Sequence, residues 1–370
     1  MSPGAAVLAH DSVTAYGGGE RTLEALFPLL PDAPLFTAVF RPPVSLADCG
    51  RRAVRTSFLQ RAPLPTRLLK PLFPLAFASL HPPADTELIL SSSSGYAKGL
   101  RHPRAVHVTY VHTPIRRVWN AYHRAARRPP RGPLNLAESL TLRMLRRWDL
   151  VSMRRVHHVV ANSQNTAGQI QRIYGRAATV VPPPVRTSFF VRDARPQNED
   201  YFLTVARLDP YKRIDLAIAA CRALDLRLVV VGDGVERSRL SAQAGPGVTF
   251  LGSVDDLTLR SLYQRCRALV FPGEEDFGIA PVEAQACGRP VVAFAAGGAL
   301  ETIVDGETGV LFDTQTVEGL VAALQRFGRL SFDAARIRQH AVTFDEVEFQ
   351  QRMRDVVTAA MLGPRERSWR

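Results

Sequence analysis

Residues 268–288 read ALVFPGEEDFGIAPVEAQACG, and this stretch decides the fold. Its apolar start, residues 268–271, predicts a buried strand, and a helix is expected from about residue 278 to residue 287. The loop between them carries Glu275 and the helix carries Glu283, with seven residues separating the two carboxylates. Because free N–H groups at a helix N-terminus bind anions, the unit offers amides for a phosphate and carboxylates for hydroxyl groups. A strand, a turn and a helix with two solvated acids would give the same pattern.

Strands and helices alternate along the rest of the chain. Further strands are predicted at residues 7–10, 35–40, 87–91, 107–112, 156–161, 179–182, 201–206, 227–231, 248–251 and 291–294. Repeated βα units of this kind build a mostly parallel, doubly wound sheet. A chain of 370 residues exceeds what one hydrophobic core usually serves, so two such sheets are expected, with the polar residues 186–200 as the linker.

A colinear set of shorter motifs surrounds the opening stretch. In chain order they are GGGE at residues 17–20, YVHTP at 110–114, ANS at 161–163, VPPP at 181–184, RLDPYK at 207–212, VGDG at 231–234 and GG at 297–298 followed by Glu301. Together with the paired glutamates, this set resembles the signature of retaining glycosyltransferases of family 4. The resemblance covers nearly the whole chain, and the ordered set is far more specific than any single motif.

The resemblance implies an α/β protein with the GT-B fold, in which two Rossmann-like, doubly wound parallel-sheet domains face a cleft. Residues 1–188 would form the N-terminal acceptor domain, and residues 189–347 would form the C-terminal nucleotide-sugar donor domain. A helix within residues 348–370 is expected to pack back on the first domain.

The resemblance also implies roles for individual residues. The expected catalytic residues are His112, Arg207, Lys212 and Glu275; the expected donor-binding residues are Gly18, Gly19, Gly232, Val254, Phe277, Gly278, Ile279 and Glu283; and Arg116 and Trp119 are expected near the acceptor. In such enzymes the histidine faces the donor sugar, the first glutamate fixes sugar hydroxyl groups and the second holds the ribose. The plain alternatives are a structural histidine at a core edge, a flexible glycine turn and a pair of surface cations.

The leaving group of a nucleotide sugar gains negative charge, which metal ions or fixed cations and amides must stabilise. The sequence contains no Asp-x-Asp, the usual metal anchor of the other glycosyltransferase fold. Arg207 and Lys212 follow the predicted strand 201–206, at the carboxyl edge where α/β sheets bind ligands. We therefore expect no metal site and no cofactor beyond the nucleotide-sugar co-substrate.

The net charge of +13 is concentrated in one segment. Residues 101–156 hold thirteen arginines against two acidic residues, a local balance of +11, and residues 67–77 add a basic-apolar stretch. These segments are candidates for contact with an anionic membrane and a lipid-linked acceptor. An arginine-rich composition on ordinary solvated faces explains the charge equally well, since lysines are scarce.

Cysteine usage and the lack of targeting signals indicate the cellular compartment of the protein. The four cysteines (Cys49, Cys221, Cys266 and Cys287) form no CxxC pair, which argues against a zinc site or a disulfide framework. No long uncharged apolar run or signal-peptide pattern is evident. The expected location is cytoplasmic, with peripheral contact on the inner face of the membrane as a further expectation.

The motifs around His112 and Lys212 are similar to those of bacterial mannosyltransferases that build surface polysaccharides. The leading expectation is therefore transfer of mannose from GDP-mannose to a glycan or lipid-linked acceptor, although Arg117 stands where many such relatives have an aromatic residue. The alternatives are a UDP- or ADP-sugar donor, another GT-B enzyme such as an epimerase or phosphorylase, and a basic nucleic-acid-binding scaffold. The sequence lacks the aromatic or helix-turn-helix motifs of a nucleic-acid binder, so no nucleic-acid partner is expected.

Overall fold

The computed structural model describes residues 5–41, 52–119, 133–194 and 199–363. The chain divides into two compact units, residues 1–182 with 349–370, and residues 183–348. Cys49, four arginines of the basic segment (Arg124, Arg127, Arg128 and Arg131) and residues 364–370 lie outside the described residues.

The first unit contains a seven-stranded sheet in which every recorded strand pairing is parallel. Its order is β3-β2-β1-β4-β5-β6-β7. Strands β2 and β3 are added on one side of β1, and strands β4 to β7 are added on the other side. The strands are β1 (Ala6–His10), β2 (Leu35–Thr37), β3 (Val54–Thr56), β4 (Leu88–Ser93), β5 (Val106–Val111), β6 (His158–Ala161) and β7 (Thr179–Val180). Every residue of β4 and β5 is buried, as expected for central strands of a sheet covered on both faces.

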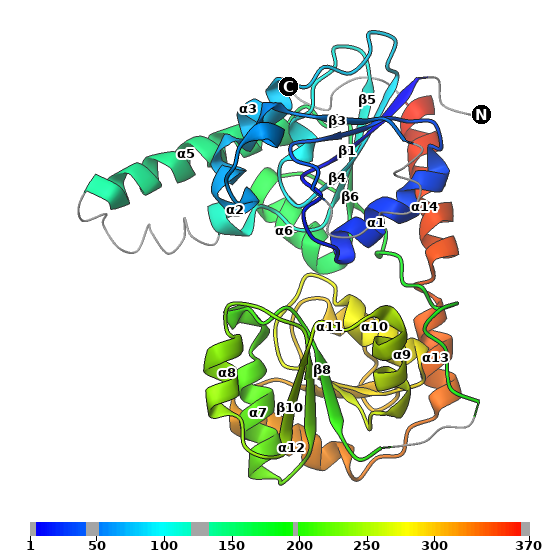
Figure 1. Cartoon of the computed structure of the whole chain (residues 1–370). Coiled ribbons are helices and arrows are strands. Elements are labelled where there is room, and N and C mark those ends of the chain that lie inside the picture. The colour runs from blue at the N-terminus through cyan, green and yellow to red at the C-terminus, as the bar shows by residue number, and fades with distance from the viewer. Residues whose placement is uncertain (1–4, 42–51, 120–132, 195–198, 364–370) are drawn as a thin grey trace. The chain divides into compact units, whose positions relative to one another are not determined.

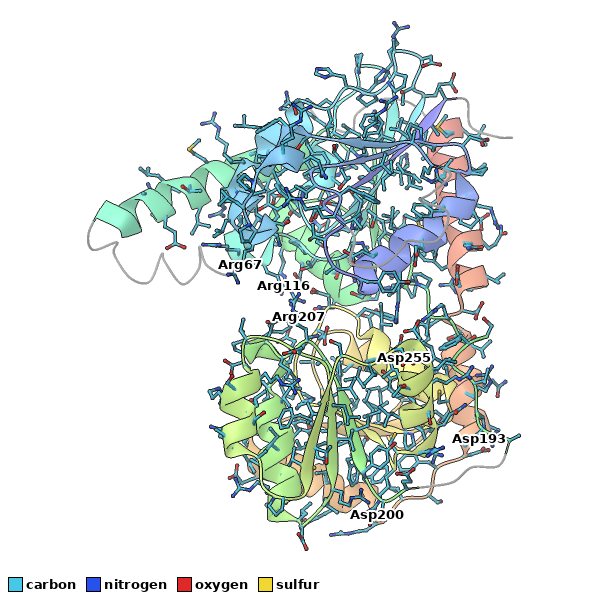
Figure 2. All side chains as sticks on the ribbon, viewed as in Figure 1. Arg67, Arg116, Asp193, Asp200, Arg207 and Asp255 are labelled. Atoms are coloured by element: carbon cyan, nitrogen blue, oxygen red, sulfur yellow. The ribbon has the colours of Figure 1, made fainter. Side chains whose placement is uncertain are left out.

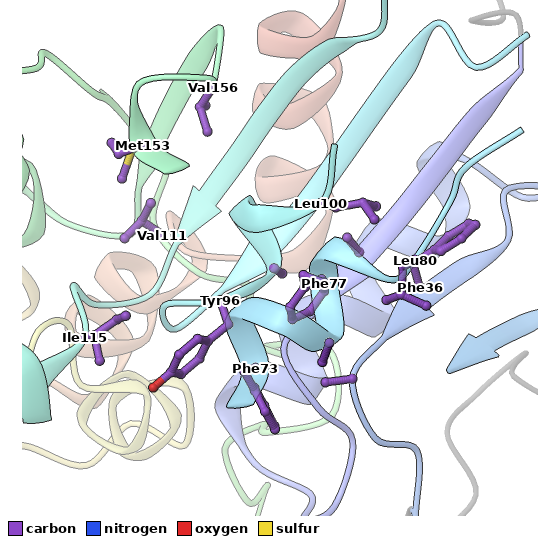
Figure 3. Packing of buried hydrophobic residues seen from close by; sticks show 14 of the residues in the cluster. Phe36, Phe73, Phe77, Leu80, Tyr96, Leu100, Val111, Ile115, Met153 and Val156 are labelled. Carbon is purple, nitrogen blue, oxygen red and sulfur yellow. The ribbon is translucent and has the colours of Figure 1, made fainter. Parts of the chain in front are cut away.

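Helices cover both faces of this sheet (Figure 1). They are α1 (Gly18–Leu26), α2 (Thr66–Leu69), α3 (Phe73–Ala78), α5 (Pro133–Met153), α6 (Gln164–Tyr174) and α14 (Glu346–Leu362), with short 3₁₀ turns at Phe27–Leu29, Phe58–Arg61, Lys70–Leu72 and Ala97–Gly99. Phe73 and Phe77 of α3 reach into one core layer (Figure 3). On the other face, Phe349 and Met353 of α14 join a core layer with strand residues such as Tyr110.

The second unit contains a six-stranded parallel sheet of order β10-β9-β8-β11-β12-β13. The strands are β8 (Phe202–Val205), β9 (Leu228–Val231), β10 (Val248–Gly252), β11 (Leu269–Phe271), β12 (Val291–Phe294) and β13 (Gly309–Phe312). This is the strand order of a Rossmann sheet, whose ligands bind beyond the carboxyl ends of the strands at the point where the order reverses, here between β8 and β11.

The helices of the second unit also form two layers around its sheet. They are α7 (Ile214–Ala223), α8 (Arg237–Gln243), α9 (Asp256–Arg265), α10 (Ile279–Ala286), α11 (Ala299–Thr302), α12 (Val317–Phe327) and α13 (Ala334–Val342), with a 3₁₀ turn, η5, at Pro210–Lys212. Local sequence explains several of their starts. Asp255, for example, caps α9 by accepting the Thr258 N–H at 2.8 Å.

The expected pair of Rossmann-like parallel sheets is therefore confirmed. The interpretation of residues 186–200 as a linker is wrong for its first part. Val185 and Phe190 are buried in the core of the second unit, and the Val185 N–H donates to the carbonyl of Phe344 at 3.0 Å. The second unit thus begins at Pro183, before the expected boundary at residue 188, because these apolar side chains complete its core.

Two further findings concern the described residues. Cys221, Cys266 and Cys287 are free and buried, and burial raises the pKa of the Cys221 and Cys266 thiols to about 12. No helix in the part of the chain that the structure describes has the length and apolar character needed to cross a membrane.

Candidate functional site

Most of the expected donor-site residues lie on loops at one edge of the second sheet, where β8, β9, β10, β11 and β12 end. Arg207 follows β8, Gly232 follows β9, Glu275 follows β11, and Gly297 follows β12. Figure 2 shows Arg207 at this end of the second unit and Asp200, which precedes β8, at the opposite end. Parallel pairing brings the carboxyl ends together, so loops distant in the sequence become neighbours.

The central feature of this edge is an ion pair between Lys212 and Glu275. The Lys212 Nζ donates to Glu275 Oε1, and the two side chains are 12% and 20% exposed, respectively. Lys212 ends the 3₁₀ turn after β8, and Glu275 lies in the loop after β11. The pair therefore joins the two strands between which the strand order reverses. A partly buried cation and carboxylate at this position can bind a phosphate and a hydroxyl group, respectively.

Glycines allow the loops around this ion pair to touch backbone to backbone. A Cβ atom on Gly273 would lie 2.8 Å from Lys212 Cα, and one on Gly298 would lie 2.2 Å from Phe277 Cα. The Gly298 N–H donates to the Glu275 carbonyl at 2.8 Å. Gly273 and Gly298 thus fix Lys212 and Glu275 relative to each other through the main chain.

Arg207 is the exposed cation of the group, with 70% of its side chain accessible. Its Nε donates to Asp209 Oδ2 at 2.5 Å. Burial of the group lowers the pKa of Arg207, but the hydrogen bond and the charge of Asp209 outweigh burial, so the pKa lies above its ordinary value. Arg207 therefore remains a permanent positive charge at this edge.

The helix α10 begins next to Glu275 without a side-chain cap. Its N-cap residue is Gly278, with φ of 94°, a left-handed conformation that favours glycine. Phe277 is buried and packs edge-on against Phe344, whereas Ile279 is half-buried. This placement is compatible with the expected anion-binding amides of residues 277–279.

Glu283 lies inside α10 and is buried. Its Oε2 accepts a hydrogen bond from the Tyr263 hydroxyl at 3.0 Å. Tyr263 comes from α9, is fully buried and was not singled out from the sequence. A tyrosine within an ordinary amphipathic helix gives no signal for such a contact, which only the packing of α9 on α10 creates.

Gly232 and Val254 lie at the same edge of the sheet. Gly232 has φ of 119°, and a Cβ there would lie 2.0 Å from the Ala206 carbonyl oxygen. Close packing of the loops after β8 and β9 explains this glycine without a ligand. Val254 is half-buried and packs against the core.

In the first unit, His112 follows β5 and is half-buried. Its Nε2 lies 2.8 Å from the Ser92 Oγ, and the same oxygen lies 3.2 Å from the Nδ1 of His10. The His10 Nε2 is 3.9 Å from Glu20 Oε1. The backbone carbonyl of His112 accepts a hydrogen bond from the Asn162 side-chain amide at 2.9 Å.

Gly18 and Gly19 form the first two residues of α1, beside this group. A Cβ on Gly19 would lie 3.9 Å from the His10 ring, and the Gly17 N–H donates to Glu20 Oε2 at 3.0 Å. The glycines thus bring the start of α1 close to His10. Burial raises the pKa of Glu20, but the hydrogen bond and charge of His10 outweigh it, so the pKa of this carboxyl lies below its usual value.

The two residues expected near the acceptor have different environments. Arg116 is half-buried and is the first residue of the helical segment 116–119. Trp119 is only 5% exposed, its indole N–H donates to the buried Asp149 at 2.8 Å, and the Arg146 guanidinium lies 4.6 Å from its ring centre. Asp149 also accepts from Tyr174 and pairs with the buried Lys98. Trp119 is thus packed in the core of the first unit, and its expected place near the acceptor stays a prediction.

Among the described residues, no group of three or more His, Cys, Asp or Glu side chains is arranged to hold a metal ion. The charged groups at this edge of the second sheet include two ion pairs, Arg207 with Asp209 and Lys212 with Glu275.

Comparison with known proteins adds two family matches. Residues 16–189 match the family described as Glycosyltransferase Family 4, and residues 185–342 match the family described as Glycosyl transferases group 1.

Individual relatives agree with these matches. The chain is 32% identical over 195 residues to a GDP-mannose-dependent alpha-mannosyltransferase from Mycolicibacterium smegmatis, covering 49% of this chain and 52% of that protein. It is 34% identical over 219 residues to a D-inositol 3-phosphate glycosyltransferase from Geodermatophilus obscurus, covering 50% of this chain and 49% of the relative. The matched segments thus span about half the length of these curated relatives.

A solved structure matches the fold along almost the whole chain. The crystal structure of Anabaena Alr3699/HepE in complex with UDP and glucose has a TM-score of 0.72, 19% sequence identity, and coverage of 95% of this chain and 99% of that chain.

Proposed function

Because the chain belongs to glycosyltransferase family 4, we propose that it transfers a hexose from a nucleotide sugar to a glycan or lipid-linked acceptor, with retention of the anomeric configuration and without a metal ion. The single observation that carries this proposal is the Lys212–Glu275 ion pair at the edge where β8 and β11 end. There, one cation and one carboxylate are held together by close backbone packing, next to the uncapped start of α10.

In this proposal, Lys212 and Arg207 neutralise the diphosphate as the bond between the sugar and the phosphate breaks. Backbone N–H groups at the start of α10 donate hydrogen bonds to the same diphosphate, and Glu275 accepts hydrogen bonds from sugar hydroxyl groups. The departing phosphate oxygen takes the proton of the acceptor hydroxyl, while the acceptor oxygen bonds to the anomeric carbon on the face that the phosphate leaves. Retention of configuration follows from this front-face exchange.

GDP-mannose is the proposed donor. The motifs around His112 and Lys212 support it, as does the likeness to a relative that is named a GDP-mannose-dependent alpha-mannosyltransferase. UDP- and ADP-sugars are the alternatives, because Arg117 departs from the mannosyltransferase pattern.

Thermal-shift measurements against GDP-, UDP- and ADP-sugars test the donor, with GDP-mannose expected to give the largest rise in Tm. NMR of the product then tests the mechanism, since an α-linked product is expected from an α-linked donor. A β-linked product would contradict retention, and the absence of any shift with every nucleotide sugar and every nucleoside diphosphate would contradict the proposed class.

A basic-apolar surface on the first unit supports a lipid-linked acceptor at the inner face of a membrane. We define this surface by its exposed residues Phe58, Arg61, Leu64, Arg67, Leu68, Lys70, Leu72 and Leu75. Leu68 and Leu75 are 58% and 60% exposed, whereas Leu69 and Phe73 of the same helical segment are buried in the core. No acidic residue occurs between Asp48 and Asp85. Exposed leucines beside positive charges fit an anionic bilayer surface.

Vesicle co-sedimentation tests this surface. The protein is expected to bind vesicles that contain phosphatidylglycerol and to release them at high salt, and Leu68→Asp with Leu75→Asp should abolish binding. Leu257→Asp is the matched control, because Leu257 is an equally exposed leucine on the second unit. Equal binding by all variants would overturn the proposal, and salt-sensitive binding to duplex DNA without vesicle binding would favour the nucleic-acid alternative.

A further inference from the structure

Four polar side chains form a continuous row at the carboxyl edge of the first sheet. Glu20 lies in α1, His10 ends β1, Ser92 lies near the end of β4, and His112 follows β5. His10 and Ser92 are direct partners in the register of β1 and β4, the two strands between which the strand order reverses. The backbone ladder therefore fixes the separation of these two residues.

The contacts run in one order from Glu20 to His112. Glu20 Oε1 lies 3.9 Å from His10 Nε2, His10 Nδ1 lies 3.2 Å from Ser92 Oγ, and Ser92 Oγ lies 2.8 Å from His112 Nε2. Each imidazole therefore meets the serine hydroxyl through a single, defined nitrogen. Glu20 is itself held by the Gly17 N–H at 3.0 Å.

A hydroxyl group has one proton to donate, so the two histidines cannot both accept from Ser92. The Glu20 carboxylate favours a proton on the His10 Nε2 that faces it, which leaves Nδ1 of neutral His10 as an acceptor. Ser92 then donates to His10 Nδ1 and can only accept from His112. The proton of the neutral His112 ring is thereby assigned to Nε2.

We propose that Glu20, His10 and Ser92 are positioning residues that hold His112 in its Nε2–H tautomer, with Nδ1 as the hydrogen-bond acceptor for a substrate hydroxyl group. The inference rests on the proposed function and on the expectation, drawn from the family resemblance, that His112 faces the donor sugar. It adds three residues to that function, each acting through His112 without touching the substrate.

The surroundings of the row keep it rigid. The Asp11 carboxylate, directly after β1, accepts hydrogen bonds from the Ser94, Tyr96 and Ala97 N–H groups and so ties the end of β1 to the loop after β4. Ser92 is fully buried and its hydroxyl lies between two imidazoles, which suits a connecting group and excludes direct attack on a dissolved substrate.

The adjacent residue Ser91 provides a matched control. Its Oγ lies 2.9 Å from the Nε2 of His107, so β4 carries two consecutive buried Ser–His pairs. Ser92 belongs to the row, whereas Ser91 and His107 do not. Each hydroxyl makes two hydrogen bonds, that of Ser91 with His107 and Thr109 and that of Ser92 with His10 and His112. Ser91→Ala and Ser92→Ala therefore each remove two such contacts, and they should lower the Tm by similar amounts.

Steady-state kinetics with the nucleotide sugar that gives the largest thermal shift separate a positioning role from a structural one. Ser92→Ala is expected to lower kcat about tenfold or more with little change in KM. Without Ser92, His112 is free to adopt the other tautomer, in which Nδ1 carries the proton and cannot accept a hydrogen bond from the substrate in the transition state. Ser91→Ala should keep kcat within about twofold of the wild type. His10→Asn, which retains a polar atom near the Nδ1 position, should recover part of the activity that His10→Ala loses. Equal kcat losses for Ser91→Ala and Ser92→Ala would overturn the inference.

Nitrogen-15 NMR of labelled histidine reads the tautomer without substrate, with the His112→Asn variant identifying the signal. Above the titration range, wild-type His112 should show a protonated Nε2, and Ser92→Ala or Glu20→Gln should give a mixture of tautomers. A protonated Nδ1 in the wild type would overturn the inference. If His112→Ala keeps full activity, the proposed role of His112 is wrong. If activity is lost in His112→Ala but kept in Ser92→Ala and His10→Ala, only the positioning role of the row is wrong.

Discussion

Lys212 and Glu275 are 63 positions apart in the sequence, yet they form an ion pair between the 3₁₀ turn after β8 and the loop after β11. Both groups are largely shielded from water, so each has its charge balanced by the other. A bound diphosphate would compete with Glu275 for the Lys212 ammonium. The affinity for diphosphate and the activity should therefore respond differently when each partner is replaced.

Replacing Lys212 removes a cation that no metal ion is expected to replace. Lys212→Ala should weaken GDP binding by roughly 10- to 100-fold, the range for loss of a hydrogen bond to a charged group. Isothermal titration calorimetry measures this change. Arg267→Ala is the control, because Arg267 precedes β11 at the opposite edge and pairs with Asp200 at 3.0 Å. Unchanged affinity in Lys212→Ala would contradict the phosphate contact.

Replacing Glu275 should separate binding from transfer. In Glu275→Gln the Lys212 ammonium loses its competing carboxylate, so GDP should bind at least as tightly as to the wild type. Transfer should fall by about 100-fold or more, since the amide cannot replace the carboxylate as an acceptor of charge-assisted hydrogen bonds. Calorimetry and steady-state kinetics on the same sample provide the comparison, and a variant with full turnover would refute the sugar contact.

The glycine after β12 tests the close packing of the loops. Gly298→Ala places a Cβ 2.2 Å from Phe277 Cα, so the two loops must separate and both the Tm and the activity should fall. Gly168→Ala is the opposite case, because Gly168 lies in α6 and its added Cβ would meet nothing within 4 Å beyond its chain neighbours and the backbone of its own helix. Alanine there should stabilise the protein by about 0.5–1 kcal/mol. Thermal and urea unfolding check both variants, and a stable, active Gly298→Ala would show that the loops tolerate separation.

Chelation tests the proposal that fixed positive charges of the protein stabilise the departing diphosphate without a metal ion. Activity should be unchanged after dialysis against EDTA, because Arg207 and Lys212 supply the positive charge at the sheet edge. Loss of turnover that manganese or magnesium restores would count against this expectation.

His107 predicts a pH dependence of stability. Burial, together with the nearby charges of His157 and Lys98, lowers the pKa of His107 to about 3. The unfolded chain, with an ordinary histidine pKa near 6.5, binds more protons at intermediate pH, so the contribution of His107 to stability falls as the pH drops from about 6.5 toward 3. The expected slope is about 1.4 kcal/mol per pH unit once the unfolded histidine is protonated.

The variant His107→Gln removes this titration and retains a polar partner for Ser91. Urea unfolding at pH 7, 6 and 5 should show the stability of the wild type falling relative to His107→Gln as the pH decreases. If the difference in stability between the wild type and His107→Gln did not change with pH, His107 would not be buried in its neutral form.

Several elements follow from the sequence because their signals are local. The strand–loop–helix unit around Glu275 was predicted at residues 268–271 and 278–287, and β11 and α10 lie at Leu269–Phe271 and Ile279–Ala286. Other elements were missed. The strand β3 has only three residues with no fully buried position. The helix α5 starts at Pro133, a favourable first helical residue, but it lies in the segment that was interpreted only as a basic surface.

The sequence by itself determined the alternation of strands and helices, the two-sheet architecture and the set of charged residues at strand ends, because apolar periodicity and motif order are properties of neighbouring residues. Only the tertiary structure decided which of these groups meet. The pairing of Lys212 with Glu275, the burial of Trp119 against Asp149 and the row from Glu20 to His112 all join residues that are distant in the chain or lie on different elements. Such contacts depend on strand order and register, which parallel β-sheet pairing sets through long-range hydrogen bonds that no local pattern encodes.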